Sequence, residues 1–114
     1  MTKILENYAE GRWVKSAGGL SPIHSALSGD VVAETGSDGL DFGGMADFAR
    51  KKGGKALRAM TFHERALMLK ALGQAIMERK EELYDLSWDT GATRTDSWID
   101  IEGGAGTLFS YASK

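Results

Sequence analysis

Residues 61–114 read TFHERALMLKALGQAIMERKEELYDLSWDTGATRTDSWIDIEGGAGTLFSYASK, and this stretch decides the fold. Apolar residues recur at helical spacing from Phe62 to Leu86, with polar residues between them. Thr61 and Glu64 have the spacing of a capping box. The pattern predicts a long amphipathic helix from residue 61 to about residue 89, with Gly91 as its stop.

A final helix is predicted from about Ser97 onward, capped by Thr95 or Asp96. One face of it is formed by Trp98, Ile101, Ala105, Leu108 and Ala112. No helix stop signal follows before Lys114. We therefore expect the chain to be a piece of a longer protein.

The first 37 residues carry strand and turn signals instead. Residues 8–14 predict one β-hairpin around Glu10-Gly11, and residues 23–27 and 31–35 predict a second. Asp41 then predicts the cap of a helix over residues 42–52, which Gly53-Gly54 would end or bend. The expected fold class is α+β in one segment, 1–114, with two hairpins (1–37) followed by three α-helices (41–114).

Composition excludes several classes of function. The net charge of −2 gives no basic surface for nucleic acid or an anionic membrane. No apolar run approaches the ~20 residues of a membrane span, and we expect a cytoplasmic protein. The chain has no cysteine, which removes disulfides and a cysteine nucleophile from these residues.

The glycine-rich residues 99–106 invite comparison with a phosphate-binding loop. Gly104 and Gly106 supply one G-x-G, but Phe109 stands at the third glycine position of the dinucleotide fingerprint. The alternative is a helix with small residues on one side, where another surface or a ligand comes close. Asp96, Asp100 and Glu102 are candidate carboxylates for a metal site. On a helix, however, Glu102 points away from the face that the other two share, and no histidine lies nearby, so a metal site is not expected. The residues alone predict no catalytic, cofactor-binding or metal-binding group.

Several short motifs, taken in order, resemble the aldehyde dehydrogenase family. They are Gly11-Arg12-Trp13, the Gly29-Asp30 turn before a β-branched strand, Arg65-Ala66-Leu67-Met68-Leu69, and Thr90-Gly91. The family's Asn-Pro before the turn is missing, and its Lys-Pro after Thr-Gly is replaced by Ala92-Thr93. Residues 56–62, 90–94, 96–98 and 100–104 resemble the aldehyde dehydrogenase half of the bifunctional enzymes of phenylacetate degradation.

The resemblance implies that the chain is the N-terminal part of an aldehyde dehydrogenase-like α/β fold. The parent would oxidise a CoA-linked semialdehyde with NAD or NADP, using a cysteine, a glutamate and an asparagine that this chain lacks. The chain alone would bind no cofactor and be inactive. In the family the last helix borders the substrate tunnel, which places Asp100, Gly103, Gly104 and Thr107 nearest to it.

Two alternatives stay open. The parent could be the related CoA-semialdehyde dehydrogenase of aerobic benzoate breakdown. The chain could instead be a stand-alone helical interaction module without enzymatic activity. The expected partner is the remainder of the dehydrogenase chain or another copy of itself, so a homo-oligomer is expected.

Overall fold

A computed structural model describes residues 2–114, whose contacts divide the chain into two compact units. The first unit ends at Arg58, and the second covers Ala59–Lys114. The strands of the described residues all lie in the first unit, and the two longest helices lie in the second. The predicted α+β class is confirmed.

The first hairpin forms as predicted. Strands β2 (Asn7–Ala9) and β3 (Arg12–Val14) pair antiparallel, with Tyr8 opposite Trp13. Glu10 and Gly11 connect them at φ 51° and 81°. Positive φ at both central residues is the geometry of a two-residue type I′ turn, whose twist suits the two strands. The Tyr8 and Trp13 rings meet edge to face, with centroids 5.1 Å apart.

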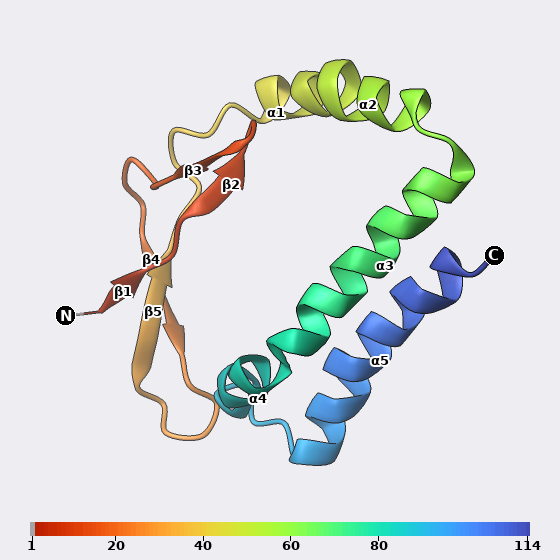
Figure 1. The fold of residues 1–114 in the computed structure, drawn as a ribbon. Coiled ribbons are helices and arrows are strands. Elements are labelled where there is room, and N and C mark those ends of the chain that lie inside the picture. Colours follow the sequence, from red (N-terminus) through yellow and green to blue (C-terminus); the bar gives the residue numbers. More distant parts are fainter. Residues whose placement is uncertain (1) are drawn as a thin grey trace. The chain divides into compact units, whose positions relative to one another are not determined.

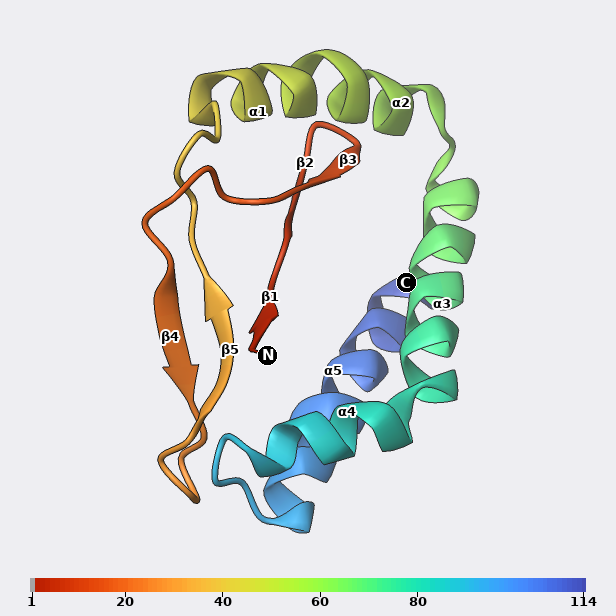
Figure 2. The same ribbon diagram turned by 90° about the vertical axis from the view of Figure 1, so that its left-hand side faces the viewer.

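The second hairpin belongs to a three-stranded sheet of order β1-β5-β4. Strand β5 (Val31–Thr35) pairs antiparallel with β4 (Ser21–His24) and parallel with β1 (Lys3–Ile4). Figure 2 shows β4 and β5 side by side. Strand β1 was not expected, because two residues are too short to show an alternating pattern.

The first strand of this hairpin was predicted at residues 23–27, which is wrong by two to three residues. Ser25 begins the turn: its backbone N–H donates to Asp30 O at 2.8 Å. The Ser25 hydroxyl also accepts from the N–H groups of Leu27 and Ser28. A serine side chain that bonds nearby backbone in this way replaces ladder bonds with a turn.

The helical part of the first unit runs further than predicted. Helix α1 (Phe42–Phe48) begins at the predicted cap, where the Asp41 carboxylate accepts from Gly44 N–H at 2.9 Å. A π-helical segment, η1 (Ala49–Gly53), and helix α2 (Gly54–Ala59) follow without a break. Gly54 stays helical at φ −61° and donates to Ala49 O. The glycine pair is thus accommodated by a wider helical turn, since glycine weakens a helix without forbidding it.

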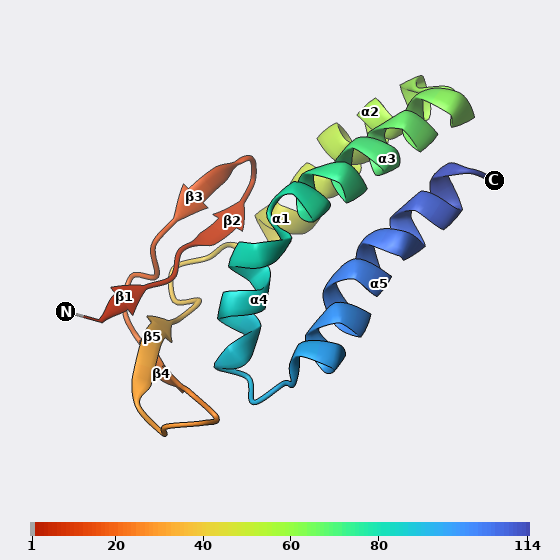
Figure 3. The same cartoon turned by 60° about the horizontal axis from the view of Figure 1, so that its bottom comes forward.

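The second unit is built on two antiparallel helices, α3 (Phe62–Glu78) and α5 (Arg94–Ala112), which lie side by side in Figures 1 and 3. Helix α4 (Lys80–Trp88) packs against the first half of α5 (Figure 2). Small residues lie at the contacts. Gly73 and Ala105 are buried, and a Cβ on Gly73 would stand 2.8 Å from Phe109 Cε1.

Two boundaries in this unit differ from the prediction. The capping box of α3 at Thr61 and Glu64 is confirmed, but the expected single helix over residues 61–89 breaks at Arg79, at φ −106° and ψ 13°. Helix α5 is capped by Thr93, not by Thr95 or Asp96. Asp96 is its third residue, and its carboxylate accepts from Thr93 N–H at 3.1 Å. Gly91, at φ 80°, is the stop after α4.

Replacing Gly73 should expose how tightly α3 and α5 pack. We expect Gly73→Ala to lower the free energy of unfolding by about 1–2 kcal/mol, because the added methyl must displace the Phe109 ring. Gly106→Ala is the matched control, since a Cβ there meets nothing within 4 Å. It should raise stability by about 1 kcal/mol through helix propensity. Urea denaturation measures the change in unfolding free energy for both variants. Changes of the same sign would contradict the packing argument.

Candidate functional site

The four residues singled out by the sequence lie on one face of α5. Asp100, Gly103, Gly104 and Thr107 follow the spacing of neighbours on a helix surface. Together with Asp96 and Ile99 they line one open hollow. This surface is here called the glycine face (Asp96, Ile99, Asp100, Gly103, Gly104 and Thr107).

The two glycines of this face are not required by packing within the described residues. A Cβ built on Gly103 or Gly104 meets nothing within 4 Å. The nearest specific interaction is local, from Thr107 Oγ1 to Gly103 O at 3.1 Å. Each glycine costs a helix about 1 kcal/mol relative to alanine. Residues 2–114 therefore give no packing reason for either glycine, and the space above them is open.

A phosphate loop does not form in this region. Residues 99–106 lie inside α5, where backbone N–H groups bond to carbonyls one turn earlier and cannot cradle a phosphate. Asp96 is occupied as part of the helix cap, and the hydrogen bonds from Thr93 hold the pKa of its carboxyl below the ordinary value. Within residues 2–114, no group of three or more potential ligand side chains is placed to hold a metal ion. The histidines lie in different units, His24 in the first and His63 in the second.

Beside the glycine face, Glu102 points the other way, toward α4. Its carboxylate accepts a hydrogen bond from the Tyr84 hydroxyl and lies 3.3 Å from Lys80 Nζ. Tyr84 is buried, at 8% exposed, and Lys80 lies one helical turn before it. These three residues, the Glu102 cluster, connect α4 to the turn of α5 that carries Gly103 and Gly104. Sequence reasoning missed the cluster.

The cluster changes the acidity of both partners. The hydrogen bond from Tyr84 holds the pKa of Glu102 below its ordinary value, and Lys80 acts in the same direction. The same hydrogen bond, with burial and the charge of Glu102, raises the pKa of Tyr84 to about 12. The carboxylate and the neutral phenol are therefore the forms that hold the two helices together.

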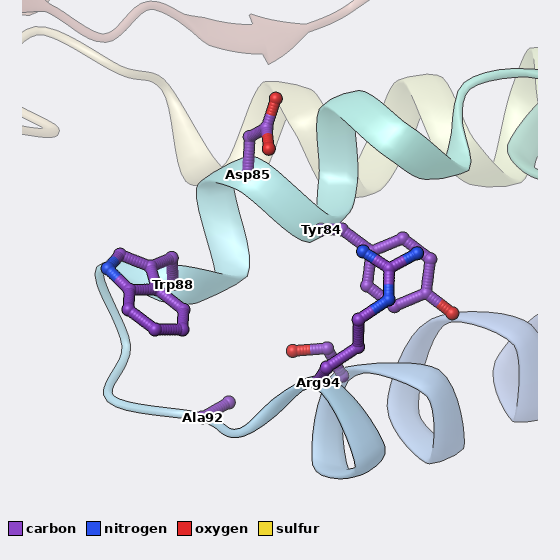
Figure 4. Close-up of a pocket in the computed structure, with 6 residues that line it drawn as sticks. Tyr84, Asp85, Trp88, Ala92 and Arg94 are labelled. Atoms are coloured by element: carbon purple, nitrogen blue, oxygen red, sulfur yellow. The ribbon is translucent and has the colours of Figure 1, made fainter.

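A second hollow, of about 260 Å³, lies between the end of α4 and the start of α5 (Figure 4). It is lined by Tyr84, Asp85, Trp88, Ala92, Arg94 and Ser97. The Arg94 guanidinium lies over the Tyr84 ring, 4.3 Å from its centroid, and 3.5 Å from a carboxylate oxygen of Glu81. Arg94 thus has an aromatic and an acidic neighbour within the same two helices.

Comparison with known proteins gives one informative similarity. The chain is 36% identical over 109 residues to the 3,4-dehydroadipyl-CoA semialdehyde dehydrogenase of Aromatoleum evansii. The match covers 95% of this chain and 21% of that enzyme, so the chain spans about a fifth of the relative's length. No protein-family model matches the chain. The similarity supports the resemblance to aldehyde dehydrogenases across nearly the whole chain.

In the part of the chain that the structure describes, no helix is both long enough and apolar enough to cross a bilayer.

The Glu102 cluster should make stability depend on pH. Because the folded-state pKa of Glu102 is depressed from 4.5, its contribution is present above that pH and is lost as pH falls through the folded value. The folded-state pKa of Tyr84 is raised from 10.0 to about 12. The contribution of Tyr84 to stability is therefore present below pH 10 and is lost as pH rises through 12. Urea denaturation should show Tyr84→Phe less stable than the wild type at pH 7, with the difference shrinking at pH 3.

Ser87→Ala is the matched control for this experiment. It removes a hydroxyl from the same helix pair, since Ser87 Oγ and Ser97 Oγ are 2.8 Å apart, but no ionisable group takes part. Its destabilisation should be the same at both pH values. A Tyr84→Phe difference that also stayed constant would show that the Glu102 charge does not contribute.

Proposed function

We propose that this chain is a structural segment of an NAD(P)-dependent aldehyde dehydrogenase that oxidises a CoA-linked semialdehyde in aromatic-acid breakdown. The observation that carries the proposal is the 36% identity, over 95% of the chain, to an enzyme named for a CoA semialdehyde. The chain has no cysteine, so a thiolate nucleophile for the aldehyde would come from outside these residues.

The residues described here do not fit the cofactor. The glycine-rich segment that resembles a dinucleotide loop is the middle of α5, and its backbone groups are used by the helix. In the proposed enzyme NAD(P)⁺ would accept the hydride, and it would bind elsewhere in the polypeptide. In this proposal the chain forms one wall of the path by which the substrate enters.

The glycine face supports that assignment. Gly103 and Gly104 remove side-chain bulk where the structure shows open space, and Asp100 and Thr107 give the hollow polar edges. A semialdehyde carried on coenzyme A is bulky and needs a wider entrance than a free aldehyde. The proposal is that the two glycines provide this clearance.

The first test is activity. The product of the open reading frame that encodes this chain should form NADH or NADPH from 3,4-dehydroadipyl-CoA semialdehyde or from the ring-opened CoA semialdehyde of phenylacetate degradation. The ratio of kcat/KM for the two aldehydes identifies the pathway. The pure 114-residue chain should form neither product, because it lacks the nucleophile. Aldehyde oxidation by the 114-residue chain alone would refute this division of roles.

A second candidate function is a stand-alone interaction module that pairs with another copy of itself. Among residues 2–114, 19 large apolar side chains are exposed against four buried apolar residues, so a partner surface is needed. This candidate predicts an open reading frame product without activity that forms concentration-dependent oligomers in sedimentation. An active product would exclude it.

The clearance hypothesis has its own test in the active product. Gly103→Leu should lower kcat/KM for the CoA-linked aldehyde by about tenfold, mainly through KM, because the added side chain fills the space above α5. A short free aldehyde should be affected less. Gly53→Leu is the matched control, since a Cβ on Gly53 also meets nothing within 4 Å and it lies in the other unit. An unchanged kcat/KM in Gly103→Leu would make the hypothesis wrong.

A further inference from the structure

The turn of α5 that carries the glycine face is the weakest part of that helix by composition. Gly103, Gly104 and Gly106 fall within four consecutive positions, and each lowers helix stability by about 1 kcal/mol relative to alanine. A Cβ on any of the three would meet nothing within 4 Å. The three glycines therefore contribute no side-chain packing to this turn, in which Ala105 is the buried residue.

The Glu102 cluster acts at this same turn. Glu102 precedes Gly103 directly, and its carboxylate is bonded to the Tyr84 hydroxyl and paired with Lys80. Both partners come from α4, so the interaction ties the turn to a second helix. Hydrogen bonds to a charged group are about twice as strong as neutral ones. The interaction also fixes the rotation of α5 about its axis: while Glu102 is held toward α4, Gly104 lies on the opposite side of the helix and Gly103 lies between them.

We propose that Tyr84 and Lys80 are positioning residues for the glycine face: by holding Glu102, they keep the turn at residues 103–106 helical and fix the direction in which Gly103 and Gly104 face. The role in substrate entry rests on the proposed function, whereas the structural effect on the turn does not. Neither residue touches the glycine face, whose members are on α5.

Hydrogen exchange in the open reading frame product tests the structural effect. Tyr84→Phe keeps the ring under Arg94 but removes the hydroxyl, and it should speed exchange of the amides at residues 103–107 by about tenfold. Ser87→Ala, the matched loss of a hydroxyl from α4, should speed exchange near residue 97 and leave residues 103–107 unchanged. Equal effects of the two variants on residues 103–107 would overturn the proposal.

A rescue experiment separates positioning from general stability. Adding Gly106→Ala to Tyr84→Phe should restore the protection of residues 103–107 by about fivefold, because alanine favours the helix at that turn. Adding Gly53→Ala, in the other unit, should not restore it. Rescue by both would mean that only overall stability had changed and would overturn the proposal. If Tyr84→Phe does not fold, Lys80→Met, which removes only the ion pair, takes its place.

Kinetics test the connection to substrate. Tyr84→Phe should raise KM for the CoA-linked aldehyde severalfold with kcat retained, and Gly106→Ala should reverse the change. A loss of kcat with KM unchanged would overturn the positioning role. An inactive wild-type product would refute the proposed function, and the exchange and rescue experiments would still decide the structural part.

Discussion

The antiparallel contact between α3 and α5 is the constraint on which the second unit depends. It favours a glycine at position 73, because the Phe109 ring occupies the place of a side chain there. Ala105, 1% exposed, lies in the same helix pair. Small residues let the helix backbones approach closely, so that larger neighbours can contact across the interface. Helix α4, the third helix of this unit, packs against α5 of this pair.

Helix α5 uses glycine residues and polar contacts differently on its two sides. Toward α4 it presents Glu102 to a buried phenol and an ammonium group, which gives a specific, directional attachment. On the other side it presents Gly103 and Gly104 to open space. The attachment on one side compensates for the weak helix propensity on the other. A stable helix and an unobstructed surface can thus occupy the same turn.

Local signals in the sequence predicted much of this fold. The Glu10-Gly11 turn, the Asp41 cap, the Thr61–Glu64 capping box and the Gly91 stop were all assigned correctly, because each depends on residues close in the chain. The break at Arg79 was missed, since neither glycine nor proline stands there and helix α4 is directed by its contacts with α5. Strand β1 was missed for a similar reason: its partner, β5, lies some 30 residues further along the chain.

In the candidate site, too, some residues were predicted from the sequence and others were not. The family resemblance singled out Asp100, Gly103, Gly104 and Thr107, and in the structure these four residues line one hollow. Their role in a substrate path came from the resemblance and stays a prediction. The Glu102 cluster could not be predicted. The spacing of Lys80 and Tyr84 places them on one face of α4, but the contact with Glu102, some 20 residues away, is made only by the tertiary fold.

The scarcity of buried apolar residues has a thermodynamic consequence. Heat-capacity change and denaturant sensitivity both scale with the surface that unfolding exposes. With four buried apolar residues among those described, the isolated chain exposes less new apolar surface on unfolding than a well-packed domain of its size. Its stability curve should therefore be shallow and its melting transition broad. Steep, cooperative melting would arise only when the exposed faces are covered. The width of the calorimetric transition therefore reports whether these helices and strands are packed against a partner surface.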